Sequence, residues 1–152
     1  MTFILPLRSI QEEDRNRVGG KAAGCATLVR LGYPVPDGFA LTTQAFDQLW
    51  EEPDLGEQRK KLFDLFRTER SEEILRQKCS EFQEKIRQAA VSAKVSEDLF
   101  AGFRNLKPPV AVRSSATAED SKVTAFAGVF DSLLHVSEEG LLSAVQIGRA
   151  HV

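Results

Sequence analysis

The chain has 152 residues, enough for one domain with a hydrophobic core, and 42% of its residues are hydrophobic. Its 20 basic and 22 acidic residues nearly balance, which argues against a nucleic-acid or membrane surface. No apolar segment has the length of a membrane span or a signal peptide, so we expect a cytoplasmic protein. Cys25 and Cys79 lack metal-type spacing and are expected to be reduced thiols.

The first predicted helix follows a diglycine. Residues 3–17 begin apolar and turn polar, which is typical of a solvated lead-in. Apolar residues then recur at helical spacing over 22–31, and Gly32 is a typical C-terminal stop. Lys21 falls in the first turn, where free N–H groups and the ammonium together favour an anion. The alternative is a capped helix with a surface lysine.

Two common phosphate-binding motifs do not fit this diglycine. A Walker loop requires a glycine five residues before Gly20 and a Ser or Thr after Lys21, but Arg15 and Ala22 occupy these positions. The dinucleotide fingerprint also fails, because Lys21 and Ala22 follow the diglycine where that motif requires spaced glycines.

The middle of the chain reads as a turn, a short strand and several helices. Residues 33–38 form a proline and glycine turn cluster before a strand at 39–41, and Thr42 or Thr43 can cap the next helix. Residues 51–106 are predicted to be helical. Within them, helix starts are indicated after the Pro53 to Gly56 break, at Ser71 and at Ser96.

A short polar stretch after a third strand carries the strongest chemical signal. Residues 110–112 predict a buried strand, and Arg113, Ser114 and Ser115 follow it, before a loop of small residues. A guanidinium beside two hydroxyls and accessible backbone N–H groups suits a polyphosphate. The alternative reading of this arginine is a salt-bridge partner. Beyond the loop, a strand is predicted at 130–136 with a structural rather than catalytic His135, followed by a helix capped by Ser137.

Three segments, taken together and in order, resemble the ATP-binding domain of the phosphoenolpyruvate synthase and pyruvate phosphate dikinase family. They are 18–23, 34–43, and the run 113–120 with 126–128 and 131–132. The resemblance covers about residues 3–146. It implies a mixed α/β (α+β) fold, the first part of an ATP-grasp-like nucleotide-binding domain with several helices around a small sheet.

The resemblance also implies roles for individual residues. Lys21 corresponds to a lysine that binds the phosphates of ATP, and Arg113 to a catalytic arginine that neutralises the transferred phosphate. Gly128 corresponds to a glycine that lets a loop approach the nucleotide. Ser132 stands where many members have a threonine near the phosphates, and it keeps the hydroxyl.

Other positions depart from the family pattern or have no assigned role. Ala125 and Val129 stand where serine and glutamine are frequent, which leaves the loop contacts open. Glu119 and Asp120 match the motif, but their role is unassigned between metal binding and capping of the loop.

The resemblance implies a parent enzyme that moves a phosphate from ATP to an enzyme histidine and then to pyruvate. The Mg²⁺ ligands and the phosphohistidine are expected outside this sequence, so no metal ligand is assigned and the chain alone is expected to be inactive. An antibiotic phosphotransferase, a glucan dikinase and a non-catalytic nucleotide-binding or regulatory module are the alternatives.

The last six residues, 147–152, do not continue the preceding helical pattern well. They can be encoded by ATC GGA AGA GCA CAC GTC, which resembles a common sequencing-adapter sequence. We therefore expect a non-native tail after Gln146 and a natural chain that continues beyond it. A source DNA sequence that lacks the adapter string would contradict this expectation.

Overall fold

The fold combines helices with short strands. The computed structural model describes residues 2–115 and 132–149. The strands are β1 (Ile4–Pro6), β2 (Phe39–Leu41), β3 (Val110–Arg113) and β4 (Ser132–Val136). The α-helices are α1 (Arg15–Arg30), α2 (Thr43–Asp47), α3 (Pro53–Thr68), α4 (Glu72–Gln88), α5 (Ala93–Phe103) and α6 (Leu141–Arg149). Single-turn 3₁₀ helices are η1 (Leu7–Ser9), η2 (Glu12–Asp14) and η3 (Gln48–Glu51).

The described strands form two antiparallel pairs. Strand β1 pairs with β2, with Ile4 opposite Leu41, and β3 pairs with β4, with Arg113 opposite Ser132. The predicted α+β class is therefore confirmed. The lead-in predicted for residues 3–17 is wrong in its first part, because strand β1 uses that segment to pair with β2.

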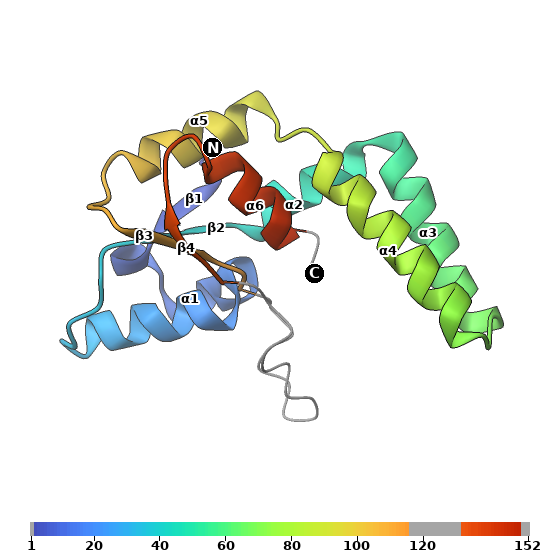
Figure 1. The fold of residues 1–152 in the computed structure, drawn as a ribbon. Coiled ribbons are helices and arrows are strands. Elements are labelled where there is room, and N and C mark those ends of the chain that lie inside the picture. Colours follow the sequence, from blue (N-terminus) through green and yellow to red (C-terminus); the bar gives the residue numbers. More distant parts are fainter. Residues whose placement is uncertain (1, 116–131, 150–152) are drawn as a thin grey trace.

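Helices cover the strands from two sides (Figure 1). Helix α1 lies below the strands in this view, and its buried Ala22 and Ala26 pack with Ile10 and with Ala40 of β2. Helix α5 lies above them, where Leu99 packs with Phe3 and with Leu141 of α6. The first two strands are thus held between two separate apolar clusters.

The two longest segments of the helical middle, α3 and α4, form a hairpin that projects from the rest of the molecule (Figure 1). Its base is an apolar cluster of Leu49, Leu55 and Ile86, against which Trp50 and Phe82 pack. The aromatic rings of Trp50 and Phe82 stack with centroids 6.2 Å apart. Trp50 therefore contributes to the packing at the base of the hairpin.

Several helix ends agree with the sequence, and others do not. Gly32 ends α1 with a φ of 80°, and Ser71 caps α4 by accepting a hydrogen bond from the Ile74 N–H. Pro53 and Gly56 were predicted to precede α3, but they lie within its first turns. Proline is compatible with the first helical position, because the N–H that it lacks would have no partner within the helix there.

The start predicted for α5 is also wrong. Ser92, not Ser96, is its cap and accepts from the Val95 N–H at 3.4 Å. Asp98 therefore lies in the second turn, buried, where it accepts hydrogen bonds from the Phe3 N–H at 2.8 Å and from Lys94 Nζ at 2.7 Å. The carboxylate joins β1 to α5 instead of supporting a helix terminus.

Strand β3 was predicted to be buried, but it is only half-buried. It belongs to a two-stranded ribbon, so that Val110 and Val112 face inward while Ala111 and Arg113 are exposed. At the end of the described chain, α6 continues through Ile147 and Gly148 to Arg149. The helical backbone therefore extends past Gln146, whereas the origin of the last six residues stays a prediction.

Candidate functional site

Two segments that the sequence analysis singled out separately meet in the structure. Helix α1 is interrupted at Gly19, whose φ of 77° and ψ of 171° lie outside the helical region. Directly after this break, Lys21 Nζ donates a hydrogen bond to the backbone carbonyl of Ser114 at 3.0 Å. The lysine of the first motif thus touches the residue that follows Arg113 in the second. We call the contact between residues 19–22 and 114–115 the junction.

The junction contains a second hydrogen bond and a close backbone approach. The Ala22 N–H donates to Ser115 Oγ at 3.3 Å. A Cβ placed on Gly19 would lie 2.6 Å from both the carbonyl oxygen and the Oγ of Ser115. Real Cβ atoms do not approach other atoms so closely, so the two segments meet at this distance because residue 19 has no side chain.

Arg113 lies beside the junction and on the exposed face of the β3–β4 ribbon. Its Nε donates to the hydroxyl of Ser132 at 3.4 Å, across the strand pair in which these two residues are directly opposite. The structure therefore brings three of the four predicted site residues to one region: Lys21 and Arg113 through Ser114, and Arg113 and Ser132 through the ribbon. Gly128, Glu119 and Asp120 lie outside the described residues.

The region is electrostatically suited to an anion. It combines an ammonium, a guanidinium and the first turn of a helix, whose N–H groups carry partial positive charge.

In the turn before the break, Asp14 accepts hydrogen bonds from the Gln11 N–H at 3.1 Å and from Arg17 at 2.7 Å. These two donors hold the pKa of the Asp14 carboxyl below its ordinary value, so it remains ionised and paired.

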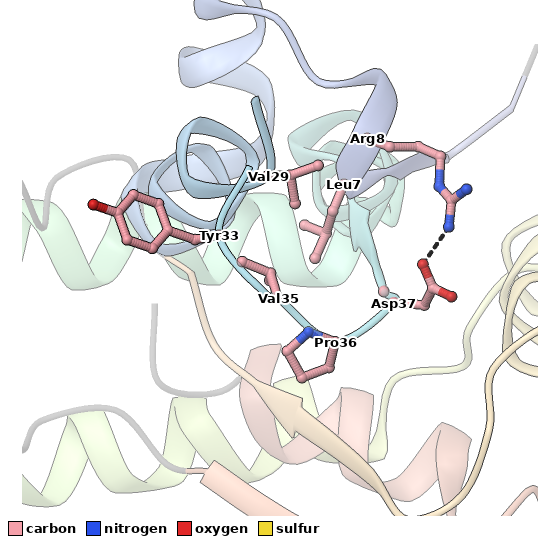
Figure 2. Close-up of a pocket in the computed structure, with 8 residues that line it drawn as sticks. Leu7, Arg8, Val29, Tyr33, Val35, Pro36 and Asp37 are labelled. Carbon is pink, nitrogen blue, oxygen red and sulfur yellow. Dashed lines mark hydrogen bonds and ion pairs between the residues drawn. The ribbon is translucent and has the colours of Figure 1, made fainter. Parts of the chain in front are cut away.

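A cavity of about 180 Å³ lies elsewhere, near the other end of α1 (Figure 2). Apolar side chains line it, among them Leu7, Val29 and Val35, and an ion pair between Arg8 and Asp37 lies at its side. Drug-sized ligands occupy pockets of about 300 Å³ or more, so this cavity is too small to enclose a nucleotide. None of the predicted site residues lines it.

The described residues do not offer a metal site or a membrane span. Within 2–115 and 132–149, no three His, Cys, Asp or Glu side chains gather where they could hold a metal ion. In the same part of the chain, no helix is both long and apolar enough to cross a membrane. Cys25 and Cys79 are free thiols, as predicted.

The sequence predicted Lys21 and Arg113 as site residues. It did not predict that Gly19 and Ser115 bring the two segments into contact. The diglycine was a visible signal of an unusual backbone at position 19. The hydroxyl of Ser115 was noticed only as a general phosphate ligand, because its contact with Ala22 joins residues 93 positions apart.

Comparison with known proteins agrees with the family resemblance of the sequence. Residues 15–148 match the family model described as "Pyruvate phosphate dikinase, AMP/ATP-binding domain". The chain is 32% identical to a probable phosphoenolpyruvate synthase of Staphylothermus marinus over 148 residues, which are 90% of this chain and 17% of that protein. It is also 32% identical to the phosphoenolpyruvate synthase of Helicobacter pylori over 149 residues, 90% of this chain and 18% of the relative.

A relative with a different name is similarly close. The rifampicin phosphotransferase of Streptomyces sviceus is 32% identical over 138 residues, 88% of this chain and 16% of that protein. The chain therefore spans about one sixth of the length of the curated relatives it matches.

Proposed function

The chain belongs to the pyruvate phosphate dikinase AMP/ATP-binding domain family, and from this premise we propose that it binds ATP with the phosphates at the junction. The observation that carries the proposal is the hydrogen bond between Lys21 and the Ser114 carbonyl, which places that lysine beside the segment of Arg113. Lys21 lies just after the helix restarts, and its partner Ser114 directly follows Arg113 in the chain. We also propose the ATP-grasp-like assignment of the fold on the same basis.

Each residue has a definite part in this proposal. Lys21 and Arg113 offset the charge of the phosphates, which is most of what phosphoryl transfer asks of a protein besides positioning. Ser132 holds the guanidinium of Arg113 by accepting from its Nε, and so limits the directions in which its other N–H groups point. Gly128 lets the loop approach the nucleotide in the same proposal.

For the parent protein we propose a phosphoenolpyruvate synthase reaction. A phosphate of ATP passes to an enzyme histidine and then to pyruvate, and the products are phosphoenolpyruvate, AMP and, with water as co-substrate, phosphate. The acceptor steps belong to other parts of such a protein, because this chain spans about one sixth of the relatives. The chain alone is then expected to bind ATP without turning it over.

The test is ATP binding by the chain and by paired variants in isothermal titration calorimetry. Lys21→Gln and Arg113→Ala are each expected to weaken binding about tenfold or more, because each removes a charge-assisted hydrogen bond to phosphate. Lys61→Gln, on the exposed face of α3, and Arg104→Ala, at the end of α5, are the matched controls and bind as the wild type does. Absence of ATP binding, or equal affinities in all variants, would refute the proposal.

A second candidate acceptor is an antibiotic, favoured by the similarity to the rifampicin phosphotransferase. Both candidates use the same ATP site, so binding by this chain does not separate them. The assay that does is phosphoryl transfer by the full-length parent with pyruvate or with rifampicin as acceptor. Transfer to pyruvate supports the synthase, and transfer to rifampicin replaces it.

A further inference from the structure

We propose that Ser115, which lies just after strand β3, is the N-terminal cap of the part of α1 that follows Gly19. We propose also that this cap positions Lys21 for the phosphates of ATP. The role toward ATP rests on the proposed function. The cap itself rests on the geometry of the junction.

The first step is the place of Gly19 in the helix. Its φ of 77° and ψ of 171° are not helical, so the helix restarts after it and Gly19 is the N-cap residue. An N-cap side chain ordinarily accepts a hydrogen bond from the N–H of the second or third helical residue. Gly19 has no side chain to do so. Counted from Gly20, the third residue is Ala22, and its N–H donates to Ser115 Oγ at 3.3 Å.

The second step is that residue 19 has no room for a cap of its own. Any side chain would begin 2.6 Å from the Oγ and from the carbonyl oxygen of Ser115. A positive φ adds a second restriction, because side chains other than glycine rarely adopt it. The glycine at position 19 and the hydroxyl at position 115 are therefore complementary: one leaves the space and the other fills the capping role.

The third step links the cap to the proposed binding residues. Ala22 is held by Ser115, and the preceding Lys21 is held by the carbonyl of Ser114, at 3.0 Å. Two consecutive residues of the helix are thus bonded to two consecutive residues after Arg113. This double attachment fixes how the first turn of α1 is rotated relative to the end of β3. It therefore fixes where the Lys21 ammonium lies relative to the Arg113 guanidinium. Ser115 is a positioning residue in this account, since its Oγ acts through Ala22.

The experiment compares two cap deletions of the same kind. Ser115→Ala removes the proposed cap of α1, and Ser71→Ala removes the cap of α4, where Ser71 Oγ accepts from the Ile74 N–H at 3.4 Å. Both variants are expected to lose similar thermal stability. Only Ser115→Ala is expected to weaken ATP binding, by about fivefold, measured by calorimetry well below the melting temperature of each variant.

The outcomes separate the two proposals. If the wild type binds ATP and Ser115→Ala binds it equally well, the positioning role is overturned while the proposed function stands. If both serine variants bind more weakly, affinity follows stability alone, and the positioning role is again overturned. If the wild type itself does not bind ATP, the proposed function fails, and the role of Ser115 toward ATP fails with it.

Discussion

The junction and the α3–α4 hairpin are stabilised in opposite ways. In the hairpin, the ion pairs of the described residues join neighbours on one helix, such as Lys61 with Glu57 and Arg76 with Glu72. At the junction, both hydrogen bonds join residues 93 positions apart. Local pairs support a helix wherever it lies, whereas long-range bonds fix the relative position of two segments. The relative position of residues 19–22 and 114–115 is therefore set by the junction itself.

Their exposure differs in the same sense. Phe63 and Phe66, on α3, are 57% and 49% exposed, whereas Gly19 and Ala22 at the junction are buried. A side chain added at Gly19 must consequently displace backbone atoms, whereas one added on the hairpin surface displaces mainly water.

Gly19→Ala is expected to have the largest effect. The new Cβ meets the Ser115 carbonyl oxygen at 2.6 Å and forces a positive φ on alanine, so the free energy of unfolding should fall by about 2 to 4 kcal/mol. Urea unfolding measures this, and ATP affinity should fall as well.

The matched control for this change lies on the same helix. Gly24 is exposed, and a Cβ added there meets no atom within 4 Å, so Gly24→Ala should raise the free energy of unfolding by about 0.5 to 1 kcal/mol. Equal effects of the two alanines would show that helix propensity, and not the junction, determines stability at position 19.

Asp98→Asn tests a second long-range contact, remote in sequence from the junction segments. Asp98 accepts from Lys94 and from the Phe3 N–H, which hold the pKa of its carboxyl below the ordinary value. The variant should lose about 1 to 2 kcal/mol of unfolding free energy at neutral pH, with ATP affinity unchanged. Loss of ATP binding in this variant would mean that affinity does not depend on the junction in particular.

The pH dependence of this loss follows from the lowered pKa. A carboxylate whose folded-state pKa is depressed contributes its full stability above the unfolded pKa, about 3.9, and loses it as the pH falls through the folded value. The difference between wild type and Asp98→Asn should therefore shrink in unfolding experiments below about pH 4. A difference that is constant down to pH 2 would contradict the assigned ion pair.

Arg76→Ala on the hairpin should have the smallest effect. Arg76 and Glu72 are paired at 2.6 Å but are 79% and 78% exposed. Exposed pairs of this kind contribute little, so the melting temperature should change by no more than about 2 °C. A larger shift of the melting temperature in differential scanning calorimetry would mean that this exposed ion pair stabilises the hairpin more than expected.

The sequence predicted the features that depend on near neighbours. The stop of α1 at Gly32 and the cap of α4 at Ser71 require only residues within one turn, and both are confirmed. The helix start predicted at Ser96 was wrong, because α5 begins one turn earlier and is capped by Ser92. Asp98 lies in the second turn of α5 and accepts a hydrogen bond from the Phe3 N–H, 95 positions away. A contact across that separation has no signal in the local sequence.

The same limit applies to the candidate site. Lys21 and Arg113 could be proposed as site residues because each lies in a segment with its own chemical pattern. Strand β1 could not, since it has three residues and its pairing partner is more than thirty residues away. The capping contact of Ser115 with Ala22 was equally hidden, because a serine after a strand has no local signal that it will meet a helix start.

An NMR titration of the ¹⁵N-labelled chain with ATP tests directly whether the phosphates bind at the junction. If they do, the amide signals of residues 19–22 and 113–115 shift together and saturate with one dissociation constant. The Lys21→Gln variant should show much smaller shifts at the same concentrations. Shifts confined to the residues around the cavity of Leu7 and Val35, or no shifts at all, would contradict the placement of the phosphates at the junction.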